Sequence, residues 1–130
     1  MIVNRIDLVL LENIKDELIS KINLSDREAH IFLYLIINDK TPLQEISDDL
    51  KIPLNKTTQL LNGLIEKGLI LELSGVYQTF HPKFSIVNAY RLHCQKIGIE
   101  FKKNVHIDSL ASSLERMHES ARTKYGNENQ

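Results

Sequence analysis

The sequence has 130 residues, of which 42% are hydrophobic and 25% charged, as is typical of a globular domain with its own core. Its single cysteine, Cys94, excludes an internal disulfide and a zinc site made of several cysteines. The formal net charge is −1, but residues 1–50 hold five basic and ten acidic side chains, a net −5. Residues 51–130 hold eleven basic and seven acidic ones, a net +4. An anionic partner is therefore expected to bind the second half of the chain.

The start of the sequence does not resemble a secretion signal. Met1 is not followed by a charged and then apolar leader that ends in small residues. The longest strongly apolar run, Ile31–Ile37, is too short to span a bilayer. We therefore expect a cytoplasmic protein that does not bind membranes.

The first two predicted helices have clear apolar patterns. Residues 5–22 predict an amphipathic helix, whose apolar stripe contains Ile6, Leu10, Ile14 and Leu18. The second helix is expected to start at a capping box, in which Ser25 and Glu28 each accept a hydrogen bond from the other's backbone amide. Core-facing residues then continue to Ile36, and the helix is expected to end at residues 38–40.

Two shorter helices are predicted next. Residues 41–44, Thr-Pro-Leu-Gln, resemble a second capping box with Pro42 in the first helical position. The helix that follows ends at Lys51-Ile52-Pro53. Another helix is predicted from Leu54 to Lys67, with Thr57, Leu61 and Leu64 facing inward and Gly68 as its stop.

After Gly68 the pattern changes from helical to extended. Residues 69–73 and 76–80 predict two strands, and Ser74-Gly75 between them predicts a turn. His81-Pro82 is expected to end this β-hairpin.

The last third of the sequence carries two heptad-like runs with a change of register near Asn104. Either one long helix with a stutter or two helices separated near Asn104 would produce this pattern. A seam of this kind suggests self-association, although the segment could instead fold back. The predicted dimer contacts are Ile86, Tyr90, Ile97, Phe101, Leu110, Leu114 and Met117. Residues 124–130 are polar and predicted to be disordered.

This order of elements predicts a mainly α fold with a small β-hairpin, the winged helix-turn-helix, extended by an N-terminal helix and a long C-terminal helix. The expected divisions are an N-terminal helix (1–22), a winged helix-turn-helix domain (23–84), a C-terminal dimerisation helix or helix pair (85–123) and the tail. In this fold, one helix leaves a free face that can enter a DNA major groove, and the hairpin, or wing, lies beside it.

Three motifs resemble the TrmB-like transcription regulators. Leu24-Ser25-Asp26-Arg27-Glu28-Ala29 is similar to the family's opening motif, and Ile52-Pro53-Leu54-Asn55-Lys56 to its entry into the recognition helix. Leu64-Ile65-Glu66-Lys67-Gly68-Leu69-Ile70 is similar to the end of that helix, although this piece is shared by many winged helices. The resemblance implies a DNA-binding regulator. Larger members carry a C-terminal sugar-binding domain, for which 130 residues leave no room, and members usually place arginine in the recognition helix, where this chain has none.

The predicted DNA-binding residues fall into two groups. Asparagine and glutamine can pair with adenine, and lysine with guanine, so the expected base-contacting residues are Asn55, Lys56, Thr58, Gln59 and Asn62. The expected backbone-contacting residues, on the helix flanks and the wing, are Lys51, Lys67, Tyr77, Gln78, Thr79, His81 and Lys83.

No spacing in the sequence predicts a metal site, a cofactor or catalysis. His93 and Cys94 are adjacent and would diverge on a helix, and His106 and His118 are far apart in sequence. No phosphate-binding glycine loop, nucleophile elbow or zinc-protease motif is present. We therefore expect a protein that is not an enzyme.

Two functions remain in competition. The first is a sequence-specific regulator that binds double-stranded DNA as a homodimer; a small-molecule effector is open, but the sequence identifies no site for one. The alternative is a winged-helix adaptor that binds other proteins in a larger assembly. The acidic first half and the apolar Leu54 at the start of the recognition helix favour the adaptor.

Overall fold

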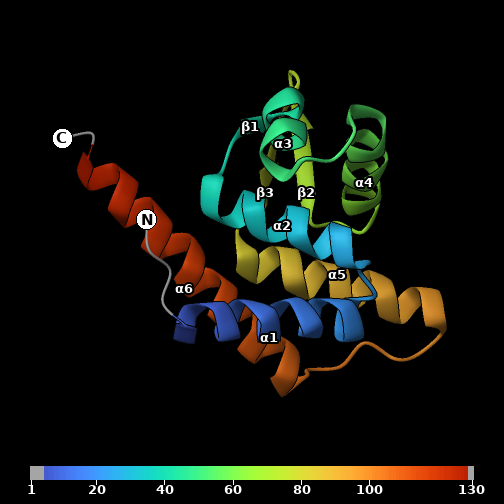
Figure 1. Ribbon diagram of the computed structural model, residues 1–130. Helices are drawn as coiled ribbons and strands as arrows, with labels where there is room; N and C mark the ends of the chain where they lie inside the picture. The colour runs from blue at the N-terminus through green and yellow to red at the C-terminus, as the bar shows by residue number, and fades with distance from the viewer. Residues whose placement is uncertain (1–4, 129–130) are drawn as a thin grey trace.

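The computed structural model describes the backbone of residues 5–128 and the side chains of residues 10–122. These residues form a mainly α structure with a small antiparallel sheet, so the predicted winged helix-turn-helix class is confirmed (Figure 1). The elements are α1 (Arg5–Ile22), α2 (Asp26–Asn38), β1 (Thr41–Pro42), α3 (Leu43–Leu50), α4 (Leu54–Glu66), β2 (Ile70–Leu73), β3 (Val76–Thr79), α5 (Pro82–Ile97) and α6 (Val105–Glu128).

The sheet contains one more strand than predicted. β2 and β3 form the expected hairpin, whose turn residues Ser74 and Gly75 have φ values of 53° and 81°. Positive φ at both positions is typical of a type I′ turn, which matches the twist of paired strands. β1 adds to the free edge of β3, with Thr41 opposite Tyr77. The capping box predicted at Thr41 was therefore wrong: its hydroxyl donates to Asp39 O at 2.7 Å, and Pro42 precedes the helix.

One hydrophobic core includes residues of all six helices. α2 lies at its centre, with α1 and α5 below it, α3, α4 and the sheet above it, and α6 running obliquely from below α1 to the left-hand side of α2 (Figure 1). Phe32, Leu35 and Ile36 of α2 are fully buried. The predicted stripe of α1 is confirmed at Ile14 and Leu18, which are buried, whereas Leu10 is half exposed and the side chain of Ile6 lies outside the described part.

The C-terminal segment forms two helices that pack against each other, so the second alternative for this region is correct. α5 ends at Ile97 and is capped by Gly98, whose φ of +76° is most favourable for a residue without a Cβ atom. Asn104 then starts α6, because its Oδ1 accepts hydrogen bonds from His106 N at 2.9 Å and Ile107 N at 3.3 Å. The tail prediction was wrong up to Glu128, where the α6 backbone is still helical; residues 129–130 lie outside the described part.

Folding back places most of the predicted dimer seam inside the chain. Ile86, Leu110 and Leu114 are fully buried in the core, and Tyr90 and Met117 are partly buried against it. The two apolar runs pack within one chain. The five residues just named are therefore not available for contact with a second copy. The exposed members of the predicted set are Ile97 and Phe101.

The C-terminal part of α6 is attached to the end of α2 by one arginine, six residues before α6 ends. Arg122 Nη1 donates to Ile37 O at 3.0 Å, and Nη2 donates to Ile36 O at 2.9 Å. Its Nε lies 3.6 Å from Asp39 Oδ2. The guanidinium therefore satisfies carbonyls that the last turn of a helix leaves without partners. Among residues 5–128, none of the helices is both long and apolar enough to cross a membrane.

Candidate nucleic-acid interface

The turn between α3 and α4 is fixed by two buried hydroxyl groups. Ser47 Oγ donates to Ile52 O at 2.6 Å, and Thr57 Oγ1 lies 3.2 Å from the same oxygen and 3.0 Å from Pro53 O. Ile52 N returns a bond to Ser47 O at 3.1 Å. The two helices are therefore held at one relative orientation, which determines the direction in which α4 presents its outer face.

The inner face of α4 packs on the core and its outer face is open. Thr57, Leu61 and Leu64 are completely buried, as predicted. The outer side chains that sequence analysis assigned to base contact are exposed at Asn55, Lys56, Gln59 and Asn62.

Thr58 differs from its neighbours on this face. It is only partly exposed, and its hydroxyl donates to Leu54 O at 3.0 Å. Leu54 itself is 45% exposed, which places an apolar side chain at the start of the same face.

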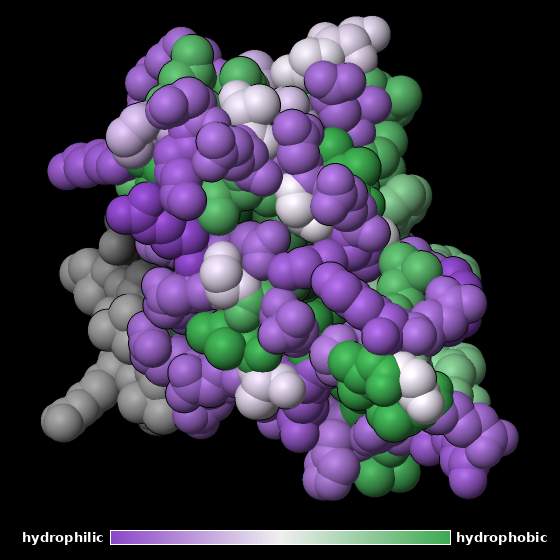
Figure 2. Space-filling model, turned by 90° about the vertical axis from the view of Figure 1, so that its right-hand side faces the viewer, coloured by the Kyte–Doolittle hydropathy of each residue, from purple (hydrophilic) through white to green (hydrophobic). Residues whose placement is uncertain are grey.

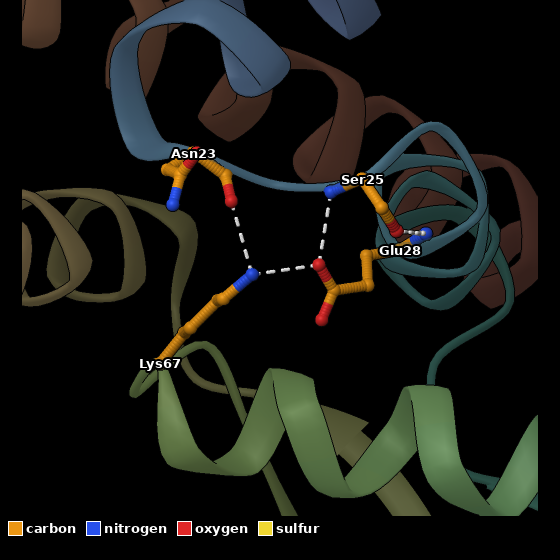
Figure 3. A network of polar contacts seen from close by, with 4 residues as sticks. All are labelled: Asn23, Ser25, Glu28 and Lys67. Carbon is orange, nitrogen blue, oxygen red and sulfur yellow. Dashed lines mark hydrogen bonds and ion pairs between the residues drawn. The ribbon is translucent and has the colours of Figure 1, made fainter.

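Lys67, predicted to contact phosphate, is instead part of an internal network (Figure 3). Its Nζ lies 2.7 Å from Glu28 Oε1 and donates to Asn23 O at 3.0 Å. The same carboxylate oxygen accepts from Ser25 N at 2.9 Å, and Ser25 Oγ accepts from Glu28 N at 3.1 Å, so the predicted capping box is confirmed. Lys67 therefore connects the end of α4 to the start of α2.

The remaining predicted phosphate-binding lysines are exposed. Lys51 caps the end of α3 with a left-handed backbone, φ 56° and ψ 45°, three residues before the start of α4. Lys83 lies in the first turn of α5, next to the end of the wing. Both lysines remain candidates for contact with the phosphates of a DNA backbone because their side chains reach solvent.

The wing offers less to an anion than its sequence suggested. Tyr77 is 6% exposed, and burial raises the pKa of its hydroxyl, so its side chain belongs to the core. Gln78 and Thr79 are partly exposed, and Thr79 Oγ1 is buried without a hydrogen-bond partner among the described residues. The exposed positions at the tip are Glu72, Leu73, Ser74 and Gly75, none of which is cationic.

His81 faces α6. Its Nδ1 accepts a long hydrogen bond from Lys83 N at 3.4 Å, and its Nε2 lies 3.7 Å from Glu115 Oε2. Its ring centre is 5.8 Å from that of His118. Sequence analysis missed this association because 34 residues separate His81 from Glu115 and no local pattern connects them.

Acidic side chains on α3 lower the positive potential near α4. Glu45, Asp48 and Asp49 are exposed. Tyr34 donates its hydroxyl to Asp49 Oδ2 at 2.5 Å, and burial together with this carboxylate raises the pKa of Tyr34 well above its ordinary value. The open face of α4 and its surroundings therefore present polar groups and a few lysines rather than a strongly cationic surface.

The sequence model of one protein family, described as "Sugar-specific transcriptional regulator TrmB", matches residues 18–84. The matched region is slightly more than half of the chain and extends from the last turns of α1 to the start of α5. It therefore includes α4 and the whole sheet. No curated protein and no solved structure matches the chain.

Proposed function

Because the chain belongs to the TrmB family of transcriptional regulators, we propose that it is a sequence-specific regulator that binds double-stranded DNA as a homodimer. Family membership makes it a DNA-binding transcriptional regulator. The observation that carries the finer proposal is the open polar face of α4, supported from behind by a buried apolar face. A single α-helix of this kind fits the width of the major groove.

In this proposal the exposed amides of α4 read bases. Asn55, Gln59 and Asn62 can each donate and accept on the adenine edge, and Lys56 can donate to guanine. Lys51 and Lys83 neutralise phosphates on either side of the groove. Thr58 contributes less because its hydroxyl is already bonded within the helix.

The experiment is a mobility-shift titration of the full chain against random duplex DNA at two salt concentrations. Phosphate neutralisation releases counterions, so affinity should fall steeply with salt. The double variant Lys56→Ala/Lys83→Ala should bind more weakly and with a shallower salt dependence. The matched control, Lys96→Ala/Arg116→Ala, removes the same charge from exposed positions on α5 and α6 and should bind like the parent. Absence of binding at low salt would contradict the proposal.

The dimer contact is assigned to the exposed apolar end of α5 and the loop that follows it. Ile97, Ile99, Phe101 and Val105 are 53%, 50%, 44% and 66% exposed. Figure 2 faces this end of α5, and hydrophobic groups stand out in its lower half among polar ones. Four exposed apolar side chains within nine residues of the sequence favour an association surface at this end of the molecule.

Sedimentation of the parent and of Phe101→Ser tests this assignment. The parent should sediment as a dimer and the variant as a monomer at the same concentration. Phe84→Ser is the control, because Phe84 is 73% exposed but lies near the start of α5. A dimer that is lost in Phe84→Ser and kept in Phe101→Ser would refute the surface, and a monomeric parent would refute the dimer.

A second candidate function is the protein-binding adaptor. Leu54 favours it, because a 45% exposed leucine at the start of the open face suits an apolar partner better than a phosphate. α4 also contains no arginine. If the mobility-shift titration shows no DNA binding at low salt, the result favours the adaptor.

A further inference from the structure

Three potential metal ligands meet between the start of α5 and the middle of α6. One ligand atom each from His81, Glu115 and Glu119 lies within 4.8 Å of the others. Glu115 and Glu119 are four positions apart on α6, so they share a face of that helix. His81 immediately precedes α5 and projects onto that face.

We propose that His81, Glu115 and Glu119 form a binding site for a divalent transition-metal ion such as Zn²⁺. An imidazole nitrogen with two carboxylates is a donor set that such ions accept, with water completing the coordination. Ligands about 2.1 Å from a tetrahedral ion are about 3.4 Å apart. His81 Nε2 and Glu115 Oε2 are 3.7 Å apart already. Glu119 is exposed, so its side chain can rotate to close the remaining gap.

The surroundings of His81 favour a fixed imidazole. Its ring packs edge-on against those of Phe84, at a centroid distance of 6.2 Å, and His118, at 5.8 Å. A ring held in this way loses little rotational freedom when an ion binds.

Binding at Nε2 needs a change of tautomer at His81. The lone pair of Nε2 must face the ion, so the imidazole proton moves to Nδ1. Nδ1 can then no longer accept the hydrogen bond from Lys83 N. That bond is 3.4 Å long and therefore weak, so little is lost with it.

The site would join parts of the chain that are far apart in sequence. His81 is two residues after β3, and both glutamates are on α6. Sequence spacing predicted no metal site because the ligands are 34 and 38 positions apart, and only the packing of α6 brings them together. The site does not include any residue of the open face of α4, although Lys83, a proposed phosphate contact, is two residues from His81.

The test is calorimetric titration of the full tag-free chain with ZnCl₂, together with the visible spectrum of bound Co²⁺. One equivalent of Zn²⁺ should bind per chain and raise the melting temperature. Glu119→Gln should weaken binding about tenfold or more and alter the Co²⁺ spectrum. His81→Asn should do the same while retaining a side chain that can cap α5.

The control is Glu12→Gln, an exposed glutamate on α1, which should bind Zn²⁺ like the parent. Lack of saturable binding by the parent would overturn the proposal. So would unchanged affinity in both Glu119→Gln and His81→Asn, because the ion would then bind elsewhere. Equal losses in Glu12→Gln would show binding by surface charge alone and would overturn it as well.

Discussion

Lys67 Nζ and Glu28 Oε1 lie 2.7 Å apart although the residues are 39 positions apart in the sequence. The carboxylate is nearly buried, with 9% of its side chain exposed, and it also caps α2 through Ser25 N (Figure 3). Removal of the lysine would leave a poorly solvated carboxylate with fewer partners. The ion pair is therefore a structural connection between the end of α4 and the start of α2.

Lys67→Ala is expected to reduce stability with little change in DNA recognition. Loss of hydrogen bonds to a charged and mostly buried group should lower the free energy of unfolding by about 2 kcal/mol. Urea denaturation measures this, and the salt dependence of DNA affinity should keep the parent slope. A stable variant with a shallower salt slope would instead identify Lys67 as a phosphate contact.

Gly63→Ala is expected to destabilise the protein, although alanine favours helix formation by about 1 kcal/mol. A Cβ atom there would lie 2.5 Å from Glu28 Oε2, so the carboxylate would have to shift and the hydrogen bonds that its Oε1 accepts would be strained. In a Glu28→Ala background, where the space beside Gly63 is free, Gly63→Ala should instead raise the free energy of unfolding. Urea denaturation of the parent, the two single variants and the double variant tests this, and equal effects of Gly63→Ala in both backgrounds would contradict it.

Ser47→Ala and Thr57→Val are each expected to lower the free energy of unfolding by about 1 kcal/mol. Both hydroxyls donate to Ile52 O, so one can partly compensate for loss of the other. The double variant should therefore lose more than the sum of the two single losses. A double-mutant cycle in urea measures the difference, and strict additivity would mean that the two bonds act independently.

Arg122→Met is expected to destabilise the protein by about 2 kcal/mol. The variant retains an apolar stem but leaves two carbonyls at the end of α2 without their donor. Urea denaturation should show the loss. Arg116→Met, at an exposed position on the same helix, is the control and should change stability by less than about 0.5 kcal/mol.

The features that could be predicted from sequence are those with local causes. The capping box at Ser25 and Glu28 depends on residues three apart, and the hairpin depends on a two-residue turn. The open face of α4 follows from a helical period that places Thr57, Leu61 and Leu64 on the opposite side.

The features that were missed depend on contacts between distant segments. Thr41 and Pro42 fit a capping box locally, but the free edge of β3 pairs with them as a strand. A heptad pattern is equally consistent with a helix of another chain and with a helix of the same chain as the partner. α5 and α6 pack against each other within one chain. Lys67 is a lysine next to the predicted recognition helix, as a phosphate contact would be, yet its side chain binds Glu28.

Arg122, in the C-terminal part of α6, connects that helix to the end of α2 and to Asp39, in the segment that leads into the sheet. Arg122 binds the carbonyls of Ile36 and Ile37, and β1, the outer strand of the sheet, begins only a few residues later. A shift of α6 would therefore be transmitted to the edge of the wing without passing through α4. Truncation of the chain before α6 would leave the carbonyls of Ile36 and Ile37 without this donor, so we expect the winged helix-turn-helix region to be less stable without its C-terminal helix.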